Sequence, residues 1–244
     1  MLLKSASIPS SELIRKNFPV VTSNQTVRWV VKPAVFLGSL VPVAWLVFAA
    51  LTGRLSADPL ADITNETGAW TLRFLCLTLS MTPLRRMTGW NGAIRFRRML
   101  GLFAFFYGSL HLLIYLVADR LASLDFPAGL VAWQTVGALM KTTLHDVLRR
   151  PFITVGVVSW LCMLPLALTS TAGMIRRLGG RRWQLLHRLT YIAALAAVLH
   201  YWWLVKADLR RPEAYALVVA LLLIFRVWWW RRSATAPVSR RAAA

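Results

Sequence analysis

The chain has 244 residues, of which 57% are hydrophobic, and it carries 29 basic but only 9 acidic side chains, a formal charge of +20. So apolar a composition is typical of a protein that crosses a membrane several times and excludes an ordinary soluble domain. The basic residues cluster between apolar segments, where membrane topology explains them, so we expect no nucleic-acid binding.

Residues 1–32 are polar and lack the apolar core and cleavage site of a signal peptide, which predicts a cytoplasmic N-terminal segment followed by a retained first span. Six apolar segments follow, each close to the length of about 20 residues that crosses a bilayer. The second is the weakest, because Arg73 interrupts it. The six predicted spans are Pro33–Thr52, Ala69–Leu84, Met99–Ala118, Pro151–Ser170, Trp183–Val205 and Glu213–Trp230.

Between the third and fourth spans, Leu130–Leu144 has apolar residues near helical spacing but is too short to cross. This pattern predicts an amphipathic helix that lies at the outer interface of the membrane. Its alternative roles are to dock a partner, to act as a lid or only to pack against the other helices. Most Lys and Arg lie in segments that the six predicted spans place on the same side of the membrane as the N-terminus. We therefore expect both termini, including the tail 231–244, to be cytoplasmic. The predicted fold is an all-α integral membrane six-helix bundle over residues 33–230, with the additional interfacial helix.

Three of the four histidines lie inside predicted spans, where ionisable side chains are candidates for functional sites. His111 and His200 lie at matching depth, roughly 8–10 Å below the outer boundary at 1.5 Å of rise per residue. Imidazoles on two facing helices can bind a haem iron from opposite sides. We therefore predict a haem between these two residues; a hydrogen bond across helices is the simpler alternative.

His187 lies near the inner end of the fifth predicted span, 13 residues before His200. On a continuous helix this spacing corresponds to about 20 Å and a rotation of roughly 140°, so the two rings cannot serve one cofactor. The equivalent inner positions on the third span are Arg97 and Arg98, whose guanidinium groups pair with propionates or phosphates rather than iron. The inner site is therefore predicted to hold a weaker haem, a quinone or a flavin.

Other residues give weaker signals. We expect His145, in the outer segment, to be a surface residue. Only two cysteines occur, Cys76 and Cys162, both in apolar runs, whereas a disulfide framework, a zinc site or an iron–sulfur cluster needs more thiols in suitable positions. A transporter is disfavoured, because no Asp or Glu lies in the middle of a predicted span.

Several short motifs together resemble the MsrQ (YedZ) family, the haem-binding membrane subunits of the periplasmic methionine sulfoxide reductase system, within the ferric-reductase-like group. The resemblance runs from about residue 68 to residue 230. Each motif alone is a weak signal, and only the motifs taken together are specific for the family. The motifs are Arg97-Arg98-Met-Leu-Gly-Leu, Phe105-Phe106-Tyr107 with His111, Arg150-Pro151-Phe152-Ile153-Thr154, Leu168-Thr169-Ser170, Trp183-Gln184-Leu185-Leu186-His187-Arg188-Leu189-Thr190-Tyr191 and His200-Tyr201-Trp202-Trp203-Leu204-Val205-Lys206.

The resemblance implies a six-helix protein of the bacterial inner membrane that binds one or two b-type haems. It implies that the family's essential histidines correspond to His111, His187 and His200, and that FMN is associated with the family. Electrons would come from the quinone pool or a cytoplasmic flavin reductase. They would pass to a periplasmic molybdopterin partner that reduces methionine sulfoxide in oxidised proteins.

Only 14 residues follow the last predicted span, and they contain no glycine-rich dinucleotide motif. We therefore expect the chain to take no hydride itself and to depend on a quinol, a bound flavin or a partner reductase. We also expect sulfoxide reduction to occur on the partner, because the sequence shows no substrate site. A stand-alone membrane reductase of metal ions or oxygen is the alternative.

Overall fold

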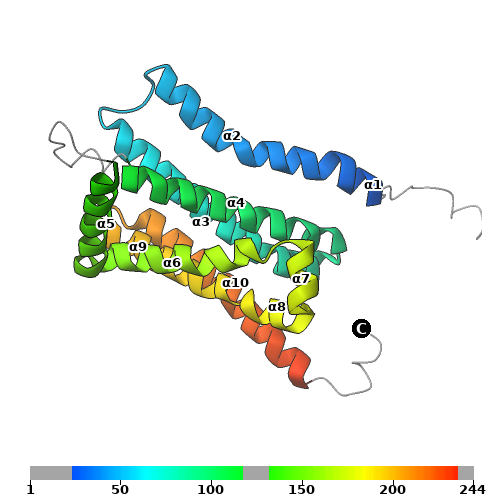
Figure 1. Ribbon diagram of the computed structural model, residues 1–244. Helices are drawn as coiled ribbons and strands as arrows, with labels where there is room; N and C mark the ends of the chain where they lie inside the picture. Colours follow the sequence, from blue (N-terminus) through cyan, green and yellow to red (C-terminus); the bar gives the residue numbers. More distant parts are fainter. Residues whose placement is uncertain (1–23, 118–131, 236–244) are drawn as a thin grey trace, which may run out of the picture. The chain divides into compact units, whose positions relative to one another are not determined.

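The computed structural model describes residues 24–117 and 132–235 (Figure 1). Two units are distinguished, residues 1–38 and residues 39–244, and each is considered by itself. The predicted N-terminal segment up to residue 23, the first two residues of the predicted interfacial helix and the C-terminal tail from residue 236 lie outside the described residues.

Every regular element in the described ranges is a helix, as expected for an all-α membrane protein. The smaller unit contains α1 (Asn24–Thr26), the π-helix η2 (Val27–Val31) and the start of α2. The larger unit begins at Ser39, within α2. Its elements are α2 (Lys32–Leu51), α3 (Pro59–Thr88), the 3-10 helix η3 (Asn91–Ala93), α4 (Ile94–Ile114), α5 (Ala132–Arg149), α6 (Pro151–Leu168), α7 (Ala172–Leu178), α8 (Gly180–Leu186), α9 (Leu189–Leu204) and α10 (Arg210–Thr235).

Four helical stretches among the described residues are long and apolar enough to cross a membrane: Val27–Leu51, Asn91–Val117, Pro151–Leu168 and Arg210–Arg232. They correspond to the first, third, fourth and sixth predicted spans. The protein is therefore a helical membrane protein. The second and fifth spans, and with them the number six, stay predictions, since α9 has only 16 residues and α3 carries charged side chains.

Local signals in the sequence explain where several helices start and stop. The side chain of Asp58 accepts a hydrogen bond from the backbone N–H of Ala61 (3.0 Å) and caps α3, with a proline in the first turn. Gly89 ends the same helix in the left-handed conformation (φ 70°), which glycine adopts without strain. Arg73, the charge inside the second predicted span, pairs with Glu66 at 3.4 Å and lies over the ring of Trp70.

The predicted fifth span is wrong as one continuous helix. The chain turns at His187 and Arg188, which separate α8 from α9. The backbone N–H of Arg188 bonds to the carbonyl of Leu185 (3.1 Å), three residues back, so the regular α-helical pattern is interrupted there. The spacing of 13 residues between His187 and His200 therefore does not give the rotation expected from a straight helix.

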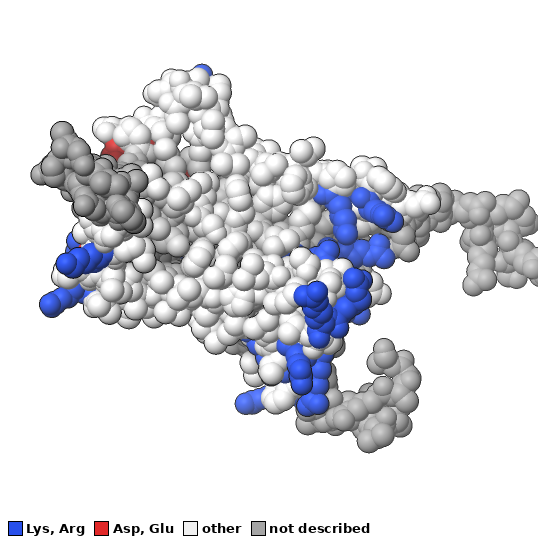
Figure 2. Space-filling view, in the orientation of Figure 1, with Lys and Arg blue, Asp and Glu red and all other residues white. Residues whose placement is uncertain are grey.

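The predicted interfacial helix is confirmed as a helix, although α5 continues to Arg149, five residues beyond the expected end. It carries an exposed apolar stripe at a spacing of four residues, Val136, Met140, Leu144 and Leu148. In Figure 1, α5 runs across one end of the larger unit, while α7 and α8 lie at the other end. In Figure 2, Lys and Arg side chains gather toward these two ends, and an uncharged middle separates them.

The core of the larger unit is built from two helix pairs, because α3 packs most extensively on α4 and α6 on α9. Phe74 on α3 stacks on Phe103 and Tyr107 of α4, with ring centroids 5.6 and 5.3 Å apart. A hydrogen bond from the indole nitrogen of Trp160 on α6 to the hydroxyl of Ser109 on α4 joins the two pairs. Within the second pair, the hydroxyl of Ser159 on α6 donates to the carbonyl of Ala193 on α9 (2.8 Å). This arrangement leaves two cavities between the helices.

Candidate functional site

The first cavity lies between α3, α4, α6 and α9, at the end of the larger unit where α5 runs, and has a volume of about 480 Å³. His111 from α4 and His200 from α9 both line it. Their ring centroids are 6.1 Å apart and their planes are inclined by 79°. The structure thus brings together the two histidines that the sequence predicted to share a cofactor, in what we call the outer cavity.

Each of these rings is held by a backbone carbonyl of a neighbouring helix. Nδ1 of His111 lies 2.9 Å from the carbonyl oxygen of Thr64, and Nδ1 of His200 lies 2.7 Å from that of Phe152. A carbonyl can only accept, so both Nδ1 atoms carry the hydrogen and donate it. The lone pair of each Nε2 is therefore free to bind a metal, which is the usual arrangement around metal-binding histidines.

Two glycines make room for the rings. A Cβ atom at Gly68 of α3 would lie 3.2 Å from Nδ1 and Cε1 of His111. A Cβ atom at Gly156 of α6 would lie 2.8 Å from Nδ1 of His200, closer than real Cβ contacts allow. Gly68 is not among the site residues predicted from the sequence. The local sequence does not reveal which side chain of a neighbouring helix will contact a glycine.

The arrangement fits a haem iron. A metal ion binds imidazole nitrogen at about 2 Å, so two rings on opposite sides of one iron have centroids about 6 Å apart. The observed separation agrees with this value. Within the described parts of the chain, no group of three or more His, Cys, Asp or Glu side chains gathers, so the two imidazoles do not belong to a larger cluster of this kind.

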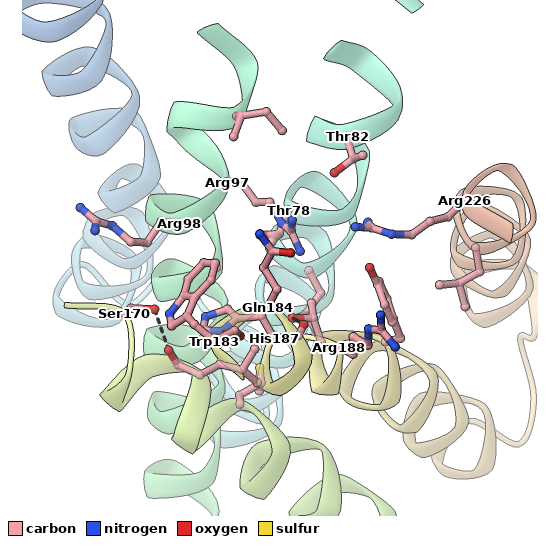
Figure 3. A pocket seen from close by; sticks show the side chains of 18 of the residues that line it. Thr78, Thr82, Arg97, Arg98, Ser170, Trp183, Gln184, His187, Arg188 and Arg226 are labelled. Carbon is pink, nitrogen blue, oxygen red and sulfur yellow. Dashed lines mark hydrogen bonds between the residues drawn. The ribbon is translucent and has the colours of Figure 1, made fainter. Parts of the chain in front are cut away.

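The second, inner cavity lies near α7 and α8 and has a volume of about 970 Å³ (Figure 3). It brings His187 together with Arg97 and Arg98, as the sequence predicted, and separates His187 from the pair in the outer cavity. Four further arginines line it, and no Asp or Glu is among its described lining residues. These four are Arg85, Arg86, Arg188 and Arg226.

His187 is oriented by its own helical turn. Its ring stacks on Trp183, with centroids 3.8 Å apart, and its Nδ1 donates to the carbonyl of Trp183 (3.0 Å). Trp183 is itself fixed by a hydrogen bond from its indole nitrogen to the carbonyl of Thr169 (3.0 Å). Nε2 of His187 is left for a ligand in the cavity.

Arg97 and Arg226 point toward one another across the inner cavity, whereas Arg98 points away from its middle (Figure 3). Arg226 comes from α10 and lies over the ring of Tyr191, with its guanidinium carbon 4.8 Å from the centroid. Arg226 is not among the site residues predicted from the sequence. The sequence does contain a signal for it, because an arginine inside an apolar span is a candidate for function.

Cationic groups that converge without acidic partners favour an anionic ligand. The buried hydroxyl of Thr82, which also lines the inner cavity, has no hydrogen-bond partner among the described residues.

The remaining histidine, His145 on α5, is exposed, as predicted.

Comparison with known proteins agrees with this architecture. Residues 66–198 match the family described as ferric reductase like transmembrane component, a range that includes His111 and His187. Three similar proteins carry the name "Protein-methionine-sulfoxide reductase heme-binding subunit MsrQ". The one from Ralstonia nicotianae is 52% identical over 84% of this chain and 88% of its own length. Those from Herminiimonas arsenicoxydans and Xanthomonas euvesicatoria are each 46% identical, over 81% and 80% of this chain and 84% and 85% of their own lengths. At such identity and coverage, the chain belongs to the MsrQ family, within the ferric-reductase-like transmembrane proteins.

Proposed function

We propose that this chain is a membrane electron-transfer subunit that binds haem b in the outer cavity, where Nε2 of His111 and Nε2 of His200 would hold the iron. The observation that carries the proposal is the pair of rings from α4 and α9, 6.1 Å apart, with each Nδ1 bonded to a carbonyl. Haem supplies one-electron chemistry when it is bound. The contribution of the chain is to fix both imidazoles in the tautomer that exposes Nε2.

The inner cavity is proposed as the place where electrons arrive. His187 is its candidate ligand to a second haem. Arg97, with Arg226 facing it and Arg98 at the rim, would bind the negative groups of a cofactor. The volume of about 970 Å³ and the six arginines favour an anionic ring compound, FMN or a second haem with its propionates, over a neutral quinone.

The final acceptor is proposed to be a separate periplasmic subunit with a molybdopterin cofactor, which reduces methionine sulfoxide in oxidised proteins. The printed name of the relatives, a heme-binding subunit of a methionine sulfoxide reductase, supports this division of labour. The electron donor would be a quinol or a cytoplasmic flavin reductase. The distribution of Lys and Arg supports placement in the inner membrane with both termini cytoplasmic.

The proposal is tested by the haem content and spectrum of the purified protein. A pyridine haemochrome assay should give haem b at one or two per chain, and a reduced-minus-oxidised spectrum should show a b-type signal. His111→Ala or His200→Ala should abolish the outer haem, because one axial ligand is lost and the other ring has no partner. His187→Ala should leave the outer haem in place.

His145→Ala is the matched control, since His145 is exposed on α5 and lines neither cavity. A colourless protein from cells well supplied with haem would contradict the proposal. So would full haem content with an unchanged spectrum in His111→Ala and His200→Ala.

A further inference from the structure

One residue connects the two cavities. Among the residues that the structure describes, Met163 on α6 is the only one that lines both the outer and the inner cavity. On the same helix, Gly156 and Ser159 line only the outer cavity, and Leu166 and Ala167 line only the inner one. Met163 therefore lies at the level where one cavity ends and the other begins.

Tight packing against α3 and α4 holds the side chain of Met163 in this place. Met163 is 6% exposed. Its terminal methyl carbon, Cε, would be 3.0 Å from a Cβ atom at Gly108 of α4, and Cγ2 of Thr71 on α3 would be 3.3 Å from the same point. The thioether thus occupies the space that the missing side chain of Gly108 leaves open.

A methionine suits this position for physical reasons. Its unbranched chain adapts to an irregular gap, and its sulfur is polarisable. Its side chain also gives a continuous row of packed atoms between the two cavities, whereas an empty space of the same size would provide no atoms in contact. Electrons tunnel more readily through bonded and packed atoms than through a void.

We propose that Met163 is the bridge through which electrons pass from the inner to the outer cavity, an inference that rests on the function proposed above. A reduced FMN or haem held in the inner cavity would be oxidised by one electron, and a haem held in the outer cavity would be reduced by that electron. The thioether of Met163 is neither oxidised nor reduced, and no bond to it forms or breaks; it acts by its position.

The test is a comparison of two reduction rates in the haem-loaded full chain in lipid nanodiscs. Photoreduced FMN, supplied as the ligand of the inner cavity, is the probe for the inner route, and dithionite is the reference reductant. Met163→Ala should slow reduction by FMN roughly tenfold, because a void replaces the packed side chain. Met163→Leu, which keeps the volume, should stay within about twofold of the unchanged protein.

Leu79→Ala is the matched control for loosened packing. Leu79 is 2% exposed, so its truncation also removes a buried side chain, but it lines neither cavity. Its reduction rates should be unchanged. Haem content, the reduced spectrum, the midpoint potential and the dithionite rate should also be unchanged in Leu79→Ala; the same four quantities are measured in the Met163 variants, and their FMN rates are compared at equal haem content and midpoint potential.

Two results would overturn the bridge while leaving the proposed function intact. One is a haem-loaded Met163→Ala protein that FMN reduces as fast as the unchanged chain. The other is an equal slowing in Leu79→Ala, which would attribute the effect to packing in general. A haem-free unchanged protein would instead overturn the proposed function, and the bridge with it.

Discussion

At the scale of single residues, the outer cavity depends on groups that themselves bind nothing. His111 and His200 are each oriented by a carbonyl oxygen, from Thr64 and Phe152. Gly68 and Gly156 stand behind the rings and let them approach the neighbouring helices. The ring positions are therefore set by backbone atoms of α3 and α6, not only by the helices that carry the histidines.

Gly156→Ala tests this arrangement. The added Cβ would lie 2.8 Å from Nδ1 of His200, so the ring has to move and its bond to the carbonyl of Phe152 is strained. We expect the affinity for the outer haem to fall about 10–100-fold, the range seen when support of a metal ligand is lost. Titration of the haem-free protein with haem, followed by absorbance, measures this change.

Gly137→Ala is the control, because a Cβ atom there meets nothing within 4 Å. Its haem affinity should equal that of the unchanged protein. Equal affinities for Gly156→Ala and the unchanged protein would show that the ring of His200 is free to shift without loss.

At the scale of the helices, α2 is joined to the rest of the larger unit through the hydroxyl of Tyr107. This hydroxyl on α4 donates to the carbonyl of Ser39 (2.8 Å) and accepts a hydrogen bond from the backbone N–H of Val43 (3.2 Å). Both backbone groups lie close to Pro42, and proline disturbs the regular hydrogen bonding of a helix.

Tyr107→Phe should therefore loosen α2 without changing the packing of the ring. Loss of the hydroxyl removes two hydrogen bonds to α2, and a typical hydrogen bond contributes about 0.5–1.5 kcal/mol to stability. A lower thermal unfolding temperature in the same detergent is the expected result. Tyr215→Phe, which removes a hydroxyl from α10, serves as the comparison and should have a smaller effect. An unchanged unfolding temperature in Tyr107→Phe would contradict the expectation that the Tyr107 hydroxyl stabilises α2.

The break between α8 and α9 shows how element boundaries escape sequence analysis. The segment Trp183–Val205 is apolar nearly throughout, and this pattern predicts one long span. In the structure the chain turns at His187 and Arg188, and a new helix begins at Leu189. Neither a proline nor a glycine marks the turn in the sequence.

At the scale of the whole molecule, the distribution of charge predicts the orientation in the membrane. Arg181 and Arg182 lie on α8, near the inner cavity, whereas Lys141 lies on α5, near the outer cavity. If the more basic side is cytoplasmic, the two positions face opposite compartments.

Cysteine labelling tests this orientation in a variant that lacks Cys76 and Cys162. Lys141→Cys should react with a membrane-impermeant maleimide added to intact spheroplasts. Arg181→Cys should react only after the membrane is opened. Both positions are exposed, so access depends on the compartment and not on burial. The reverse pattern would contradict the proposed topology.

The sequence by itself determined the class of protein, the approximate limits of four of the six predicted apolar helices and the expectation that His111 and His200 lie together. These properties follow from composition and from the regular rise of a helix, both of which are local. The tertiary structure alone decided the turn at His187, the glycines behind the rings, the place of Arg226 in the inner cavity and the position of Met163 between the cavities. Each of these depends on which side chains meet across neighbouring helices, and such contacts between residues far apart in the chain leave no periodic trace in it.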